Sequence, residues 1–201
     1  GKQTSCTSLI VAFSGLGQAE DGVPVFEWRG ALRQYASHGA SVLFLRDTHL
    51  QWYVTPRRYY CAVIRAAVRA TLDAAGKDPD ADFTKCDLAF LGNSAGGFGA
   101  LFFKTHSFPS AAVLAISPQA FLDSETRASE GDDRWAPYIN VLNKTLDDNG
   151  EKKSVNDAGS SSLLAIPQRQ RRRAMAPSVV HYNIHHALDA RHAAWLRRCC
   201  C

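Results

Sequence analysis

The chain has 201 residues, of which 46% are hydrophobic and 21% are charged. This composition suits one soluble globular domain with a sizeable core and excludes an intrinsically disordered chain. The net charge is only +4, and no apolar run reaches the length of a membrane span. The basic run Arg169–Arg173 has no aromatic residues between its arginines, so we interpret it as a solvated loop rather than a nucleic-acid site.

The ends of the chain and its cysteines add little to this picture. The first residues lack the pattern of a signal peptide, so a cytoplasmic location is the default expectation, while a start at Gly1 is consistent with a fragment of a longer chain. The six cysteines form no C-x-x-C pair, and no zinc site is predicted. We assign no role to Cys199–Cys201. We predict one domain over residues 1–201, with a polar insertion around residues 122–176.

The first predicted element is an apolar strand, Ser8–Phe13, followed by the glycine-rich turn Ser14–Gly17. Such a turn at the carboxyl end of a central strand exposes backbone N–H groups that can bind an oxyanion or a phosphate. Glu20 stands where a dinucleotide fingerprint has its third glycine, which argues against dinucleotide binding. We therefore expect Leu16 or Gly15 to donate an N–H to an oxyanion.

Two helices and a second strand come next. The apolar spacing predicts a helix at Phe26–His38 and a strand at Ser41–Leu45. A long helix then begins with Thr55 as its N-cap and ends at Gly76. Its predicted buried stripe consists of Tyr60, Ile64, Ala67, Val68 and Leu72.

The most informative stretch is Asp87–Lys104, DLAFLGNSAGGFGALFFK. A short apolar strand runs directly into Gly-x-Ser-x-Gly and then into a helix rich in small residues, which is the pattern of a nucleophile elbow. In such an elbow the serine is strained and its hydroxyl points out of the sheet. We therefore predict that Ser94 is a nucleophile and that the N–H of Ala95 binds an oxyanion. The alternative is a glycine-rich turn whose serine only caps the helix.

The rest of the chain completes an alternation of strands and helices. We predict a strand at Ala111–Ile116, a weak helix around Arg134–Thr145, a strand at Ser178–Ile184 and a last helix at Ala190–Arg198. Asp147–Arg173 lacks apolar periodicity and is expected to be the least ordered part. The fold class is α/β: a doubly wound, mostly parallel, five-stranded sheet in a three-layer sandwich, with strand order second, first, third, fourth, fifth.

A serine nucleophile needs a base, and histidine is the usual one. The histidines near strand ends are His49, His185, His186 and His192. Our first choice is His192 with Asp189 as its acid, because Asp189 lies three positions before His192 and so on the same face of the predicted helix entrance. His186 and His185 are the alternatives for the base, and Asp123 is the alternative for the acid.

Several motifs together resemble one branch of the α/β-hydrolase superfamily, found beside glycosyltransferases and polysaccharide-assembly modules. They are GNSAGGFGALFF, AISPQAFLD, RASEGDDRW and HYNIHHALDARHAAWL. The resemblance runs from Ser8 to Leu196 and implies an esterase, deacetylase or acyltransferase fold with Ser94 and His192 in the site. The polar segment Asp147–Arg173 is longer than that branch leads us to expect.

These observations favour a serine hydrolase or acyltransferase that acts on an ester, such as an O-acyl group of a carbohydrate, through a Ser-His-Asp arrangement. The expected partner is a small-molecule or carbohydrate ester, and neither a metal nor an organic cofactor is expected. The alternative is a non-catalytic, hydrolase-like binding module within a multidomain protein.

Overall fold

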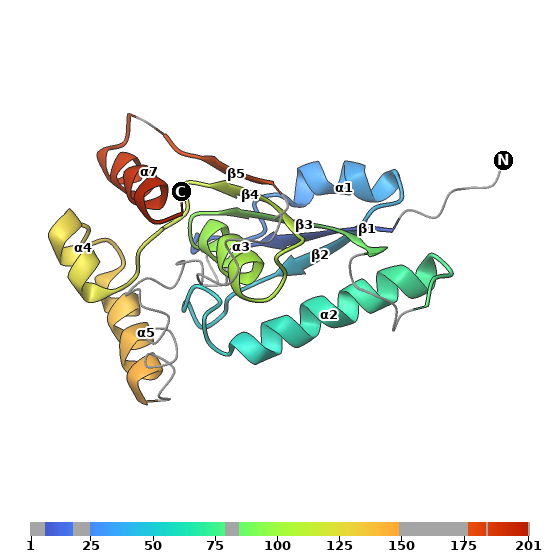
Figure 1. Cartoon of the computed structure of the whole chain (residues 1–201), viewed down its shortest axis with the longest axis horizontal. Helices are drawn as coiled ribbons and strands as arrows, with labels where there is room; N and C mark the ends of the chain where they lie inside the picture. The colour runs from blue at the N-terminus through green and yellow to red at the C-terminus, as the bar shows by residue number, and fades with distance from the viewer. Residues whose placement is uncertain (1–6, 18–24, 79–84, 149–176, 184, 201) are drawn as a thin grey trace.

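The computed structural model describes residues 7–17, 25–78, 85–148, 177–183 and 185–200, and within α7 it describes side chains only as far as Arg197. Five parallel strands form one sheet in the order β2-β1-β3-β4-β5 (Figure 1). Their bounds are β1 Ser8–Phe13, β2 Ser41–Leu45, β3 Asp87–Asn93, β4 Ala112–Ile116 and β5 Ser178–His181. The predicted fold class and strand order are confirmed.

Helices cover the sheet on both sides, which makes a three-layer α/β fold. The helices are α1 Arg29–Ser37, α2 Arg57–Ala74, α3 Ala95–His106, α4 Ser124–Glu130, α5 Ala136–Asp148 and α7 Ala187–Cys200. In Figure 1, α1 lies on one side of the sheet and α2 and α3 lie on the other. α4 and α5 lie beyond the carboxyl end of β4 (Figure 1). No described helix is both long enough and apolar enough to cross a bilayer.

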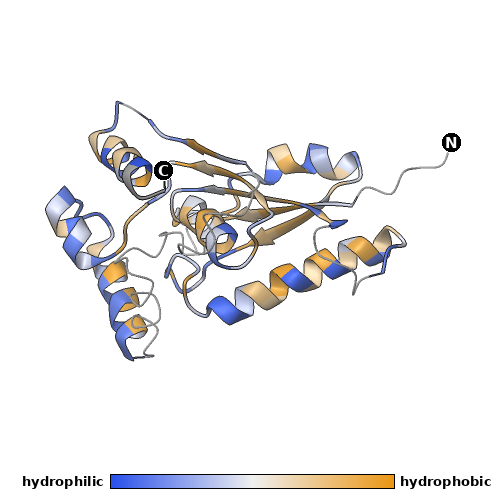
Figure 2. Ribbon diagram, viewed as in Figure 1, coloured by the Kyte–Doolittle hydropathy of each residue, from blue (hydrophilic) through white to orange (hydrophobic). Residues whose placement is uncertain are grey.

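The apolar pattern explains why these segments fold as they do. β1 and β2 have the predicted bounds, because strands that helices cover on both faces read as continuous apolar runs. Figure 2 shows mostly hydrophobic colours along the strands and an alternation of hydrophilic and hydrophobic colours along α2. The buried side of α2 holds Tyr60, Ile64, Val68, Thr71 and Leu72, so Thr71 joins the predicted stripe and Ala67 is only half-buried.

Several element ends differ from the prediction. The predicted N-cap of α2 is wrong: Pro56 holds that position, and the hydroxyl of Thr55 donates to Gln51 instead. α1 begins at Arg29 rather than Phe26, and α7 begins at Ala187 rather than Ala190. Such shifts are common because helix ends depend on tertiary contacts as well as on local sequence.

The first half of the predicted insertion is helical. α4 was not predicted, because its sequence SETRASE is polar and has no apolar period. α5 confirms the weak helix expected around Arg134–Thr145, and its buried face of Ile139, Leu142 and Leu146 packs into the core. Residues 149–176, which include most of Asp147–Arg173 and the whole arginine run, lie outside the described residues.

Candidate active site

Ser94 sits in a sharp turn between β3 and α3. Its φ of 53° and ψ of −120° are unfavourable for a residue with a side chain, and such strain persists only where the surroundings enforce it. The turn has no room for larger neighbours. A Cβ on Gly92 would lie 2.1 Å from the carbonyl oxygen of Gly96, and one on Gly96 would lie 2.3 Å from that of Phe13. The local geometry is therefore that of a nucleophile elbow.

The strand order places this turn at a crossover point of the sheet. The chain passes from β1 outward to β2 and then returns to β3, so that β1 and β3 are neighbours whose connections leave in opposite directions. Ligands of open α/β sheets bind at the carboxyl ends of such a strand pair. Phe13 and Gly92 face each other in the β1–β3 register, so the Ser14–Gly17 turn and Ser94 share one edge.

The predicted oxyanion donors differ in what they contact. Ala95 is the first residue of α3, so its N–H has no acceptor within the helix. The N–H of Gly15 donates to the carboxylate of Glu27, with N–O distances of 3.1 and 3.3 Å, and is thus already occupied. Leu16 is buried at the same turn and lines a pocket described below. Ala95 and Leu16 remain the better candidates for this role.

The predicted base, His192, lies in a buried network that leaves its ring no free nitrogen. Nδ1 accepts the N–H of Ala120 at 2.9 Å, and Nε2 lies 2.9 Å from Oδ2 of Asp132. These two bonds require the neutral tautomer with its proton on Nε2. The ring is 1% exposed and stacks on Phe121 with a centroid distance of 4.0 Å. Within the described residues, no hydrogen bond joins His192 to Ser94.

The acid expected for His192 binds elsewhere. Oδ1 of Asp189 lies 3.4 Å from Nδ1 of His186 and 3.7 Å from a guanidinium nitrogen of Arg134. The carboxylate beside His192 belongs to Asp132, which is also bonded to Arg134 through both of its oxygens. The structure therefore pairs His192 with Asp132 rather than with Asp189, because α4 and α5 bring Asp132 to the buried side of α7.

The remaining candidates have plain local roles. The other acid candidate, Asp123, accepts the N–H of Thr126 at 2.7 Å and caps α4, while its second oxygen is buried with no hydrogen-bond partner among the described residues. His186 is about half-exposed in the turn after β5, and no described residue forms a hydrogen bond with its Nε2. His185 is exposed, and its N–H donates to the side chain of Asn183.

Asp132 is the site residue that sequence reasoning missed. Burial alone would raise the pKa of its carboxyl, but the hydrogen bonds from His192 and Arg134 and the charge of Arg134 outweigh burial and hold the pKa well below its usual range. It is thus ionised at neutral pH. One signal could have found it: the chain order Ser94, Asp132, His192 is that of nucleophile, acid and base in hydrolases.

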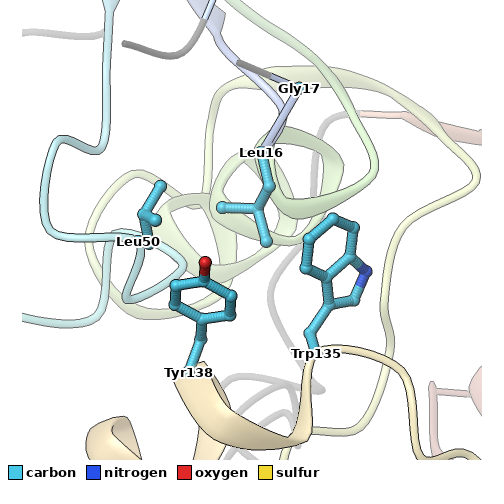
Figure 3. A pocket seen from close by; sticks show the side chains of 5 residues that line it. All are labelled: Leu16, Gly17, Leu50, Trp135 and Tyr138. Atoms are coloured by element: carbon cyan, nitrogen blue, oxygen red, sulfur yellow. The ribbon is translucent and has the colours of Figure 1, made fainter. Parts of the chain in front are cut away.

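A small pocket opens at the same edge of the sheet. It has a volume of about 190 Å³ and is lined by Leu16, Gly17, Leu50, Trp135 and Tyr138 (Figure 3). The two aromatic side chains belong to the insertion, whereas the leucines belong to the loops after β1 and β2. The insertion thus forms one wall of this pocket, and the turn after β1 forms another. The described residues contain no cluster of His, Cys, Asp and Glu that could hold a metal ion.

Compared with protein-family models, with curated proteins and with solved structures, the chain matches none of them.

Proposed function

We propose that this protein is a serine esterase or acyltransferase with Ser94 as its nucleophile. The observation that carries the proposal is the backbone of Ser94, which is strained at the end of β3 and is enclosed by Gly92 and Gly96. A serine that only capped α3 would need no such strain, and its side chain makes no cap hydrogen bond. The resemblance to the α/β-hydrolase branch also supports a serine nucleophile at this position, and an O-acyl group of a carbohydrate is the substrate that we propose.

The proposed chemistry follows from the positions of the backbone donors. The hydroxyl oxygen of Ser94 attacks the ester carbonyl carbon and loses its proton to a base, and the alcohol leaves as the acyl-enzyme forms. The N–H groups of Ala95 and Leu16 stabilise the oxyanion of the tetrahedral intermediate, helped by the positive end of α3. Water or a second alcohol then takes the acyl group, which gives hydrolysis or transfer.

Two histidines compete for the role of base. His192 has a carboxylate partner at 2.9 Å and the hydrolase chain order, but it must give up its bond to Ala120 before it can accept a proton. His186 lies five residues after the end of β5, with Asp189 beside its Nδ1 and no partner for its Nε2 among the described residues. The backbone N–H of Asp189 donates to Nδ1 of His186 at 3.4 Å, so the ring must change tautomer before Nδ1 donates to the Asp189 carboxylate and Nε2 accepts a proton, as in a serine triad.

The pairing of both nitrogens of His192 favours a second candidate function. If that network is purely structural and no histidine reaches Ser94, the protein is a non-catalytic module. It then binds an ester or a carbohydrate at the edge of the sheet that carries Ser94. Ester turnover by wild type and by Ser94→Ala separates the two functions. Turnover that disappears in Ser94→Ala supports the enzyme, and equal turnover in the two proteins rejects it.

A further inference from the structure

We propose that the pocket lined by Leu16, Gly17, Leu50, Trp135 and Tyr138 binds the acyl chain of the substrate and restricts it to a short chain. This inference rests on the proposed function and names the substrate class of the same site. Four of the five lining residues carry large hydrophobic side chains, and none carries a charge. Figure 3 shows the rings of Trp135 and Tyr138 rising from the insertion toward Leu16.

The size of the pocket limits what it can hold. Pockets for drug-sized ligands measure ~300–1,000 Å³, well above the 190 Å³ found here. A water-sized group occupies ~30 Å³, so the pocket accommodates roughly six such groups. A chain of a few methylenes fits this space and this lining. A sugar ring needs several hydrogen-bonding side chains, and among the described residues the lining side chains supply an indole N–H and a phenol hydroxyl.

The position of the pocket ties it to the reacting carbonyl. Leu16 contributes both a pocket wall and, in our proposal, an oxyanion N–H, so the pocket begins beside the oxyanion. The elbow touches this turn directly, because a Cβ on Gly96 would lie 2.7 Å from the carbonyl oxygen of Ser14. An acyl group on Ser94 therefore has its carbonyl beside Leu16 and its chain directed toward the pocket.

The wall formed by Leu50 is held rigidly. Leu50 has a φ of 54°, which a branched side chain rarely adopts. The loop around it is fixed by Asp47, a carboxylate 1% exposed that accepts the N–H groups of His49, Gln51 and Tyr53 at 3.3, 2.6 and 3.0 Å. Strained residues held by such bonds cluster at functional sites.

The wall formed by Trp135 is held in the same way. Trp135 has a φ of 60°. The carbonyl before it, that of Arg134, accepts from the buried guanidinium of Arg127 at 2.8 Å. The N–H of Arg134 donates to Asp132 at 3.0 Å, which links this wall to His192. Hydrogen bonds thus hold both walls in place without a ligand, as expected of a binding pocket rather than a shallow surface depression.

The test is a series of p-nitrophenyl esters from acetate to decanoate. We expect kcat/KM to rise about four-fold with each added methylene up to about hexanoate and to fall beyond it, because each buried methylene contributes ~0.8 kcal/mol. Leu50→Trp fills the pocket and should lower the ratio of kcat/KM for hexanoate to kcat/KM for acetate at least about ten-fold. In Tyr138→Ala, kcat/KM should rise less steeply with the length of the acyl chain.

Val141→Ala is the matched control. Val141 lies on α5 three residues after Tyr138, is 57% exposed and does not line the pocket. This variant should keep the wild-type chain-length profile. A profile that is flat in wild type, or that shifts equally in Val141→Ala and Leu50→Trp, overturns the pocket assignment while the serine hydrolase stands.

A binding measurement separates failure of the pocket from failure of the enzyme. Sodium hexanoate, sodium acetate and methyl β-glucoside are titrated into Ser94→Ala while tryptophan fluorescence is recorded. We expect a response to hexanoate that is lost in Ser94→Ala/Leu50→Trp. That result without any ester turnover keeps the pocket and rejects the catalytic function. A response to the glucoside alone, or to none of the three, overturns the pocket.

Discussion

Nε2 of His192 on α7 lies 2.9 Å from Oδ2 of Asp132 in the turn between α4 and α5, sixty residues away in the chain. The same carboxylate holds Arg134, which precedes the pocket residue Trp135. The pair thus connects the last helix to the segment that carries Trp135, and we expect its loss to lower stability.

The two candidate bases differ sharply in what they contribute to stability. His192→Ala removes a fully buried ring and leaves the carboxylate of Asp132 and the N–H of Ala120 with fewer partners, so we expect a loss of about 2–5 kcal/mol. His186→Ala changes a half-exposed side chain and should cost less than about 0.5 kcal/mol. Urea unfolding of both variants measures this, and equal losses would show that His192 is not part of the core.

Turnover of the same two variants assigns the base. Under the proposed function, the alanine variant of the true base loses nearly all ester turnover, and its combination with Ser94→Ala is little worse than either change alone. We expect the other histidine variant to retain turnover within about ten-fold at a temperature at which it is folded. Retention by both variants would mean that neither histidine is the base.

Acid should weaken the contribution of Asp132. The pKa of its carboxyl is lower in the folded protein than in the unfolded chain, so the stabilisation is complete above the unfolded pKa of about 4 and is lost as the pH falls toward the folded pKa. The difference in unfolding free energy between wild type and Asp132→Asn should be constant above about pH 5.5 and shrink below about pH 4. Asp133→Asn, at an exposed neighbouring carboxylate, is the control and should show no such change. A difference that grows on acidification would contradict the assignment.

The elbow glycines should tolerate no side chain. In Gly96→Ala the new Cβ meets the backbone oxygens of Phe13 and Ser14 at 2.3 and 2.7 Å, so we expect an insoluble or strongly destabilised protein. Gly30→Ala is the matched change in α1, where a Cβ meets nothing within 4 Å, and should stabilise by about 0.5–1 kcal/mol. Thermal melts compare them, and a stable, soluble Gly96→Ala would show that the elbow is less tight than described.

Asp47 should be essential for the loop after β2. Burial is the main reason that the pKa of its carboxyl is raised, and the backbone hydrogen bonds that it accepts only partly offset that effect. Asp47→Ala leaves three backbone N–H groups without their acceptor, so we expect a loss of about 2–5 kcal/mol and faster amide exchange at Gln51 and Tyr53. Unchanged exchange at these two amides would contradict this role.

The parts of the fold that follow from local pattern could be predicted. The strands Ser8–Phe13 and Ser41–Leu45 were located to the residue because buried parallel strands are short apolar runs between turns. Ser94 could be located because a tight elbow needs glycine on both sides of its serine. The order of the strands followed from the regular alternation of strands and helices and from short connections.

The partners of the side chains could not be predicted. Asp189 was expected beside His192 because it is three residues away, but the side chain that α4 and α5 bring to the ring is that of Asp132. The hydrogen bond from the N–H of Gly15 to the side chain of Glu27 was not expected either, because no local sequence pattern connects the segment before α1 with the turn after β1. Contacts of this kind depend on how loops and helices pack, and no periodic pattern in the sequence predicts them.

Labelling of Ser94 by a fluorophosphonate tests the central claim most directly. The probe phosphonylates a serine only when that serine is activated as a nucleophile, so it reports catalytic competence without knowledge of the substrate. We expect mass spectrometry of the digested protein to find the adduct on the peptide that contains Ser94, and Ser94→Ala to take up none. Absence of an adduct on folded wild-type protein, or equal labelling of Ser94→Ala, would contradict the account.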